Sequence, residues 1–112
     1  MTVNVYEQYF AAAHEAAGVP RRAALVMLTA DSEAGHIRYE AAVTFFPHTD
    51  EEDFAVSYDD CFTAVLYDAG GRRSKKREAA LLDGLRETVD SLVAPAGAAV
   101  FWDQPLREAR RG

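Results

Sequence analysis

The chain concentrates its acidic residues in its central third, and these carboxylates are the side chains with the widest chemical use. Between Asp31 and Asp68 ten acidic residues accompany a single basic one, Arg38, and ten minus one leaves a formal charge of −9 there, in a protein of total −6. Clustered carboxylates can transfer protons, bind hard cations or attract a cationic partner. The residues around them decide which of these chemistries the sequence favours.

Cys61 is the only thiol in the chain, and three histidines are available as bases. Nucleophilic catalysis needs a thiolate beside a base. Cys61 begins an apolar run directly after Asp59 and Asp60, whose negative charge raises the pKa of a thiol and suppresses the thiolate. We therefore expect a buried structural cysteine, and we predict no catalytic residue.

The acidic loop from His48 to Asp53 contains oxygen ligands suited to a hard cation. It lacks the D-x-D-x-D-G spacing of a calcium loop, and the chain has no Cys-x-x-Cys or His-x-x-x-His pair for zinc. Gly70 and Gly71 do not belong to a phosphate-binding loop. We expect a solvated acidic loop, and we predict neither a metal nor a cofactor.

The distribution of charge along the chain favours a binding function over a catalytic one. An isoelectric point near 4.9 disfavours nucleic acid, whereas a uniform negative surface attracts a basic protein. Phe46 precedes the acidic loop on the outward side of a strand, so it is either a binding anchor or covered by a helix. The predicted partner-binding residues are Glu40, Phe46, Asp50, Glu51, Glu52, Asp53, Asp59 and Asp60.

Length and composition predict one ordinary domain. The 112 residues, 49% hydrophobic with six Phe and five Tyr, suffice for one core spanning 1–112, with 106–112 as a frayed tail. A single cysteine cannot form an internal disulfide, no segment resembles a secretion signal, and no apolar run is long enough to cross a bilayer. These features predict a cytoplasmic protein with no membrane contact.

The first half of the chain reads as a helix followed by strands. Apolar residues recur at helical spacing from Val3 to Ala17, and Gly18 with Pro20 predicts the helix end. The apolar run 23–29, the strictly alternating run 36–46 and the alternating run 54–58 predict three strands. A short glycine-containing loop between the first two predicts an antiparallel hairpin.

The second half predicts a helix and a last strand. Residues 61–67 fit either a strand or a helix, with the strand favoured. The basic run from Arg72 to Arg77 is expected to aid solubility or to contact acidic groups elsewhere, because positive charge at a helix N-terminus is unfavourable. A long helix then follows up to Pro95, and 98–102 forms a final strand. The predicted fold is α+β in two layers: N-terminal helix, antiparallel three-stranded meander, long helix and C-terminal strand in the same sheet.

This order of elements, with FAVSYDD at 54–60 and AAVFWDQPL at 98–106, resembles the YezG-like immunity proteins of bacterial toxin systems. The resemblance implies an immunity or antitoxin-type inhibitor that holds a basic, nuclease-like toxin without turnover. Two other functions fit the sequence. One is a secretion chaperone or adaptor with exposed apolar patches, and the other is a small enzyme that uses carboxylates for acid–base catalysis.

Overall fold

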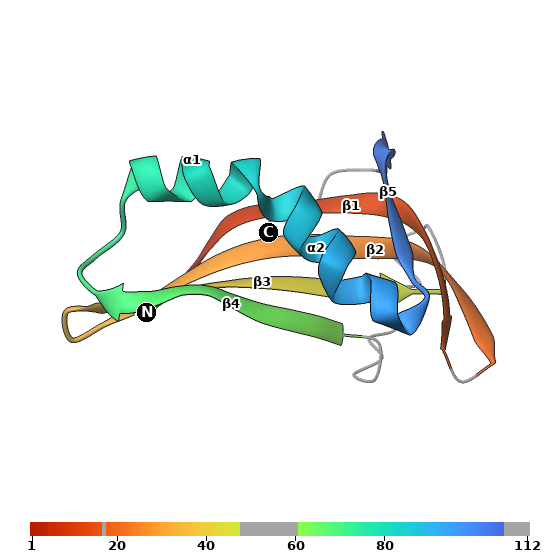
Figure 1. The fold of residues 1–112 in the computed structure, drawn as a ribbon, viewed down its shortest axis with the longest axis horizontal. Coiled ribbons are helices and arrows are strands. Elements are labelled where there is room, and N and C mark those ends of the chain that lie inside the picture. The colour runs from red at the N-terminus through yellow and green to blue at the C-terminus, as the bar shows by residue number, and fades with distance from the viewer. Residues whose placement is uncertain (17, 48–60, 107–112) are drawn as a thin grey trace.

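Five antiparallel strands form one sheet, and two helices lie over one of its sides (Figure 1). The computed structural model describes residues 1–16, 18–47 and 61–106. The strands are β1 (Thr2–Ala16), β2 (Val19–Glu33), β3 (His36–Phe46), β4 (Cys61–Gly70) and β5 (Ala99–Pro105), and the sheet order is β4-β3-β2-β1-β5. β1 to β4 follow one another across the sheet, and β5 returns to pair with β1 after the helices.

The expected N-terminal helix is wrong, because residues 2–16 form β1 and pair with β2. The register shifts twice along this pair, between Asn4 and Tyr6 and between Ala11 and His14. Each shift interrupts the two-residue alternation of the strand, so that the apolar residues mimic helical spacing. Gly18, with a φ of 79°, therefore belongs to a hairpin turn instead of a helix end.

The expected three-stranded meander is wrong for the same reason, since β1 adds a strand before β2 and β3. The hairpin between β2 and β3 is antiparallel, with Glu33 paired with His36 at its end. Residues 61–70 form β4, which resolves the ambiguity there in favour of a strand. The strand predicted at 54–58 lies outside the described residues.

β3 shows why this chain makes a two-sided sheet. Its odd-numbered residues from Ile37 to Phe45 are at most 1% exposed, whereas Arg38 is exposed and Glu40 is half-buried. Successive side chains of a strand point to opposite sides, so the odd-numbered residues face the core and the even-numbered ones face the other side, which is exposed at Arg38 and buried at Phe46. We call these the helix side and the open side.

The predicted long helix is two helices, α1 (Lys75–Asp83) and α2 (Leu85–Val93), divided at Gly84 and followed by the short 3-10 helix η3 (Ala94–Ala96). The Ser74 side chain accepts a 3.2 Å hydrogen bond from the Arg77 backbone N–H and caps α1. Gly97 then leaves η3 with a φ of 74° and leads the chain towards β5.

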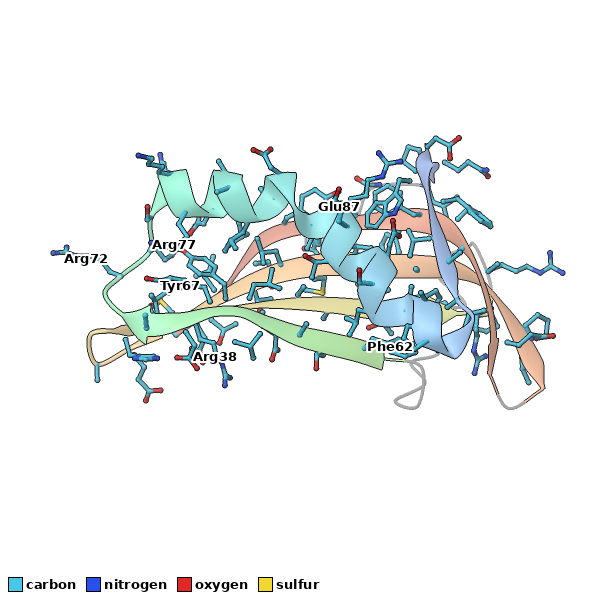
Figure 2. The ribbon with its side chains drawn as sticks, in the orientation of Figure 1. Arg38, Phe62, Tyr67, Arg72, Arg77 and Glu87 are labelled. Carbon is cyan, nitrogen blue, oxygen red and sulfur yellow. The ribbon has the colours of Figure 1, made fainter. Side chains whose placement is uncertain are left out.

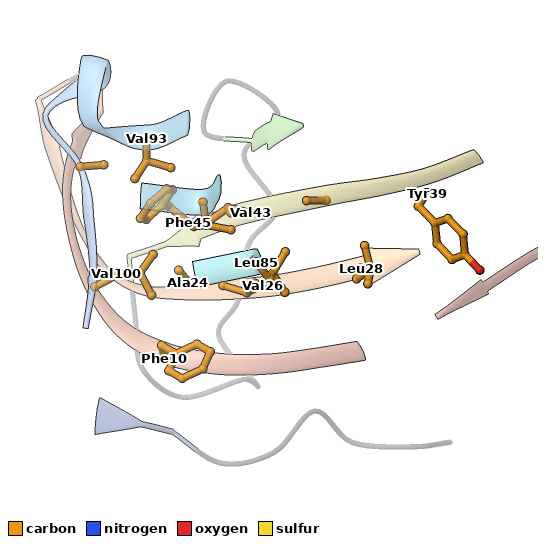
Figure 3. Close-up of a cluster of buried hydrophobic side chains, with 14 of the residues drawn as sticks. Phe10, Ala24, Val26, Leu28, Tyr39, Val43, Phe45, Leu85, Val93 and Val100 are labelled. Carbon is orange, nitrogen blue, oxygen red and sulfur yellow. The ribbon is translucent and has the colours of Figure 1, made fainter. Parts of the chain in front are cut away.

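One side of α2 covers the apolar core (Figure 3). Leu85, Val89 and Val93 recur every four residues, so they lie on one side of the helix and are buried against the sheet. Burying each such side chain contributes about 1.5–3 kcal/mol. The same buried cluster contains strand residues that include Phe10, Val26, Leu28, Val43, Phe45 and Val100.

Candidate partner-binding surface

The open side of the sheet carries charged residues at one end. Residues paired across neighbouring strands share a side of the sheet, and Asp31 of β2, Arg38 of β3 and Asp68 of β4 form one such row. Arg38 points away from the helices (Figure 2). Glu40 lies two residues along β3 from Arg38, on the same side, and Glu33 lies at the β2–β3 turn. We call Asp31, Glu33, Glu40 and Asp68 the acidic end.

Groups of the same chain neutralise this acidic end only in part. The N-terminal amino group lies 3.5 Å from Asp31 Oδ1, and His36 Nε2 pairs with Asp68 Oδ1. Arg38 and the amino terminus together offset two of the four carboxylates of the acidic end. Most of these residues line an open depression of about 480 Å³. The arrangement leaves accessible carboxylates around one arginine, which suits recognition of further cationic groups.

Two of the sequence-predicted binding residues lie in the described part of the chain. Glu40 belongs to the acidic end, opposite Val65 of β4. Phe46 lies at the other end of the same open side, where it is only 4% exposed and its ring centre lies 6.3 Å from that of Tyr9. The remaining predictions, Asp50, Glu51, Glu52, Asp53, Asp59 and Asp60, fall outside the described residues.

Beyond the acidic end, the open side is largely apolar, which sequence reasoning missed. Tyr9 of β1 pairs with Leu25 of β2, and Met27 of β2 pairs with Ala42 of β3. Phe101 of β5 pairs with Ala11 of β1 and is 38% exposed. Because residues 2–16 were expected to be helical, nothing in the sequence pattern placed Tyr9 beside Leu25 on a common surface.

Cys61 is exposed and not buried as expected, because it lies on the open side near the start of edge strand β4. The Thr44 hydroxyl donates a 3.4 Å hydrogen bond to its sulfur. Among the described residues, no group of three His, Cys, Asp or Glu side chains could hold a metal ion. In this part of the chain no helix is long and apolar enough to cross a membrane.

On the helix side, Glu78 is the buried charge of the described chain, at 7% exposure. Arg73 holds it with two hydrogen bonds, Nε to Oε2 at 2.9 Å and Nη2 to Oε1 at 3.0 Å. The Tyr39 hydroxyl donates to Glu78 Oε2 at 2.7 Å and accepts from the Ser74 backbone N–H at 3.2 Å. This network attaches the start of α1 to β3, so Arg73 of the basic run contacts an acidic group as expected. In the first turn of α1, the Arg77 guanidinium lies 3.8 Å from the centre of the Tyr67 ring (Figure 2).

The network shifts two pKa values in opposite directions. Hydrogen bonds from Arg73 lower the pKa of Glu78 below its ordinary 4.5, against the opposing effect of burial. Burial is the main cause that raises the pKa of Tyr39 above 10.0. Glu78 is thus ionised and Tyr39 neutral across the physiological range.

Stability should depend on pH through Glu78. Because its folded pKa lies below the unfolded value, its contribution is complete above about pH 5 and is lost as pH falls through the folded pKa. We expect urea midpoints of the wild type and Glu78→Gln to differ most near pH 7 and to converge as the pH falls through the lowered pKa of Glu78. A gap that stays constant over this pH range would contradict the assigned ionisation.

No family model, curated protein or solved structure matches this chain. The fold is mostly an antiparallel sheet with two helices on one side. Its open side presents an acidic end and a partly exposed apolar area, while Ala23 and Phe46 at the far end of that side are buried. A function must therefore be inferred from the chain's own residues.

Proposed function

We propose that this protein is a non-catalytic protein-binding module, an immunity or antitoxin-type inhibitor that uses an acidic surface to hold a basic, nuclease-like toxin in the cytoplasm. The acidic end of the open side carries the proposal. Asp31, Glu40 and Asp68 surround Arg38 on a rigid sheet that no helix covers among the described residues. Among the described residues, Asp31 interacts with the amino terminus and Asp68 with His36, and the negative charge that remains at the acidic end supports a role in binding a cationic partner.

Electrostatics explains why such a surface suits an inhibitor. Basic clefts that bind phosphate present a field complementary to fixed carboxylates, which accelerates association and selects the partner. Carboxylates on strands keep their spacing in the free protein, so little ordering entropy is lost on binding. An inhibitor of this kind occludes its target without turnover.

A secretion chaperone or adaptor is the second candidate, and the apolar residues of the open side favour it. Tyr9, Leu25, Met27 and Phe101 present an apolar area that a chaperone could offer to an extended client. The two candidates differ in what drives binding, because client binding on apolar residues is largely insensitive to salt.

Capture from a cell extract at two salt concentrations separates them. We expect the immobilised protein to retain a basic partner at about 50 mM NaCl and to release it at about 500 mM, where charges are strongly screened. Co-expression with that partner should then relieve its toxicity in a growth assay. Retention that is equal at both salt concentrations, or a captured partner that is acidic, would favour the chaperone and reject the inhibitor.

A further inference from the structure

The open side is divided into two halves along β2. At the acidic end, the row containing Asp31 and the row containing Glu40 are polar from β1 to β3. The rows at Met27, Leu25 and Ala23 are mostly apolar, and they continue into Tyr9 and Ala11 of β1. The polar members of these rows are Glu7, beside Met27, Thr44, beside Leu25, and Thr63, beside Ala42. We call Tyr9, Leu25, Met27 and Phe101 the apolar half.

The residues of the apolar half remain accessible. Tyr9, Leu25 and Met27 are half-buried, and Phe101 is 38% exposed, whereas their neighbours on the helix side, such as Val26 and Leu28, are completely buried. A core that is already filled from the helix side does not require large apolar side chains on the other side of the same strands. Apolar side chains that stay partly exposed on one surface are typical of sites that bind a partner.

We infer that the apolar half and the acidic end form one site, and that its occupant is a protein segment with an apolar side and a cluster of lysines or arginines beside it. This inference rests on the proposed function and names the chemistry of its partner. The apolar side of the segment covers Leu25 and Met27, and its cationic groups meet Asp31, Glu40 and Asp68.

Charge complementarity selects this occupant. The excess of negative charge at the acidic end requires cations, and a second copy of the same acidic chain would bring like charges onto the same surface. Met27 and Asp31 are four residues apart along β2, which corresponds to about 13 Å. A single amphipathic segment can span this distance with its apolar and basic groups in contact at once.

A synthetic peptide tests the inference directly. The probe is an 18-residue amphipathic peptide of leucine and lysine, with leucines along one side of a helix. One control peptide has the same composition in scrambled order. A second control peptide has glutamate in place of lysine. Affinities are measured by fluorescence anisotropy, and backbone amide shifts locate the contact. The double variant Leu25→Thr/Met27→Thr removes apolar area without changing charge, and threonine is β-branched and therefore suits a strand.

We expect the lysine peptide to bind and to change the backbone amide chemical shifts of β2 and β3. The double variant should bind this peptide at least tenfold more weakly. The matched control Ala79→Thr/Ala80→Thr changes two exposed positions of α1 and should bind as the wild type does. The scrambled peptide should bind more weakly, because its leucines no longer lie on one side. The glutamate peptide should not bind.

Three results would overturn the inference, and they differ in whether they also contradict the proposed function. Salt-sensitive binding of the lysine peptide that is equal for wild type and double variant would reject the apolar half but leave the inhibitor. Equal binding of the glutamate peptide would reject the charge assignment and with it the proposed function. A wild-type dimer in solution that the double variant converts to a monomer would make a second copy the occupant.

Discussion

Replacing Glu78 by alanine should lower the free energy of unfolding by about 2–3 kcal/mol, which corresponds to a fall of roughly 10 °C in the thermal midpoint. The substitution leaves the Arg73 guanidinium and the buried Tyr39 hydroxyl without their shared acceptor. Loss of one partner of a fully buried pair costs about 3–5 kcal/mol. The Arg73 side chain is 44% exposed, so water compensates part of this loss. Differential scanning calorimetry and urea titration measure the effect.

Glu87 provides the matched control for Glu78. It is an exposed glutamate in the first turn of α2, as Glu78 is in the first turn of α1, so both interact similarly with their helix dipoles. Glu87→Ala should change the free energy of unfolding by less than about 0.5 kcal/mol. Equal midpoints for the two alanine variants would show that the Tyr39–Glu78–Arg73 network does not hold α1 to the sheet.

Alternation within a single strand could be predicted from the sequence, and β3 shows why. Its period of two is unbroken from Ile37 to Phe45, it is bounded by Gly35 and Pro47, and its hairpin partner is near in sequence. Every local preference therefore agrees with the final fold. The turn at Ala34 and Gly35, both with positive φ, requires only local chemistry.

β1 could not be predicted, because its identity depends on partners far along the chain. Its pairing with β5 joins Ala12 to Val100, and two register shifts disturb the only local pattern that distinguishes a strand from a helix. Gly84 illustrates a smaller limit. A continuous helical pattern across it predicts one helix, whereas glycine is a poor helix former and the chain divides there into α1 and α2.

For the candidate site, the sequence revealed the kind of charge but not its arrangement. Composition alone indicated an acidic centre, and Glu40 does lie on the open side. The row of Asp31, Arg38 and Asp68 joins residues up to 37 positions apart, so no local pattern could show that the single arginine lies between two of the carboxylates. Arg38 in this row offsets part of the negative charge that the sequence count implies.

Charge reversal at the acidic end should have the largest effect on binding. Glu33→Lys/Glu40→Lys changes the net charge from −6 to −2. The double variant should bind the leucine–lysine peptide or an identified toxin about 30-fold or more weakly, because truncating or reversing charges at close pairs costs about 2 kcal/mol or more. Asp83→Lys/Glu87→Lys makes the same change of net charge at exposed helix positions and should weaken binding less than about threefold. Isothermal titration at low salt gives both affinities. Thermal midpoints of the two variants should stay close to that of the wild type, because neither pair is buried in the core. Equal losses of affinity in both variants would mean that binding depends on the net charge and not on where the charges lie. The acidic end would then not be the binding site.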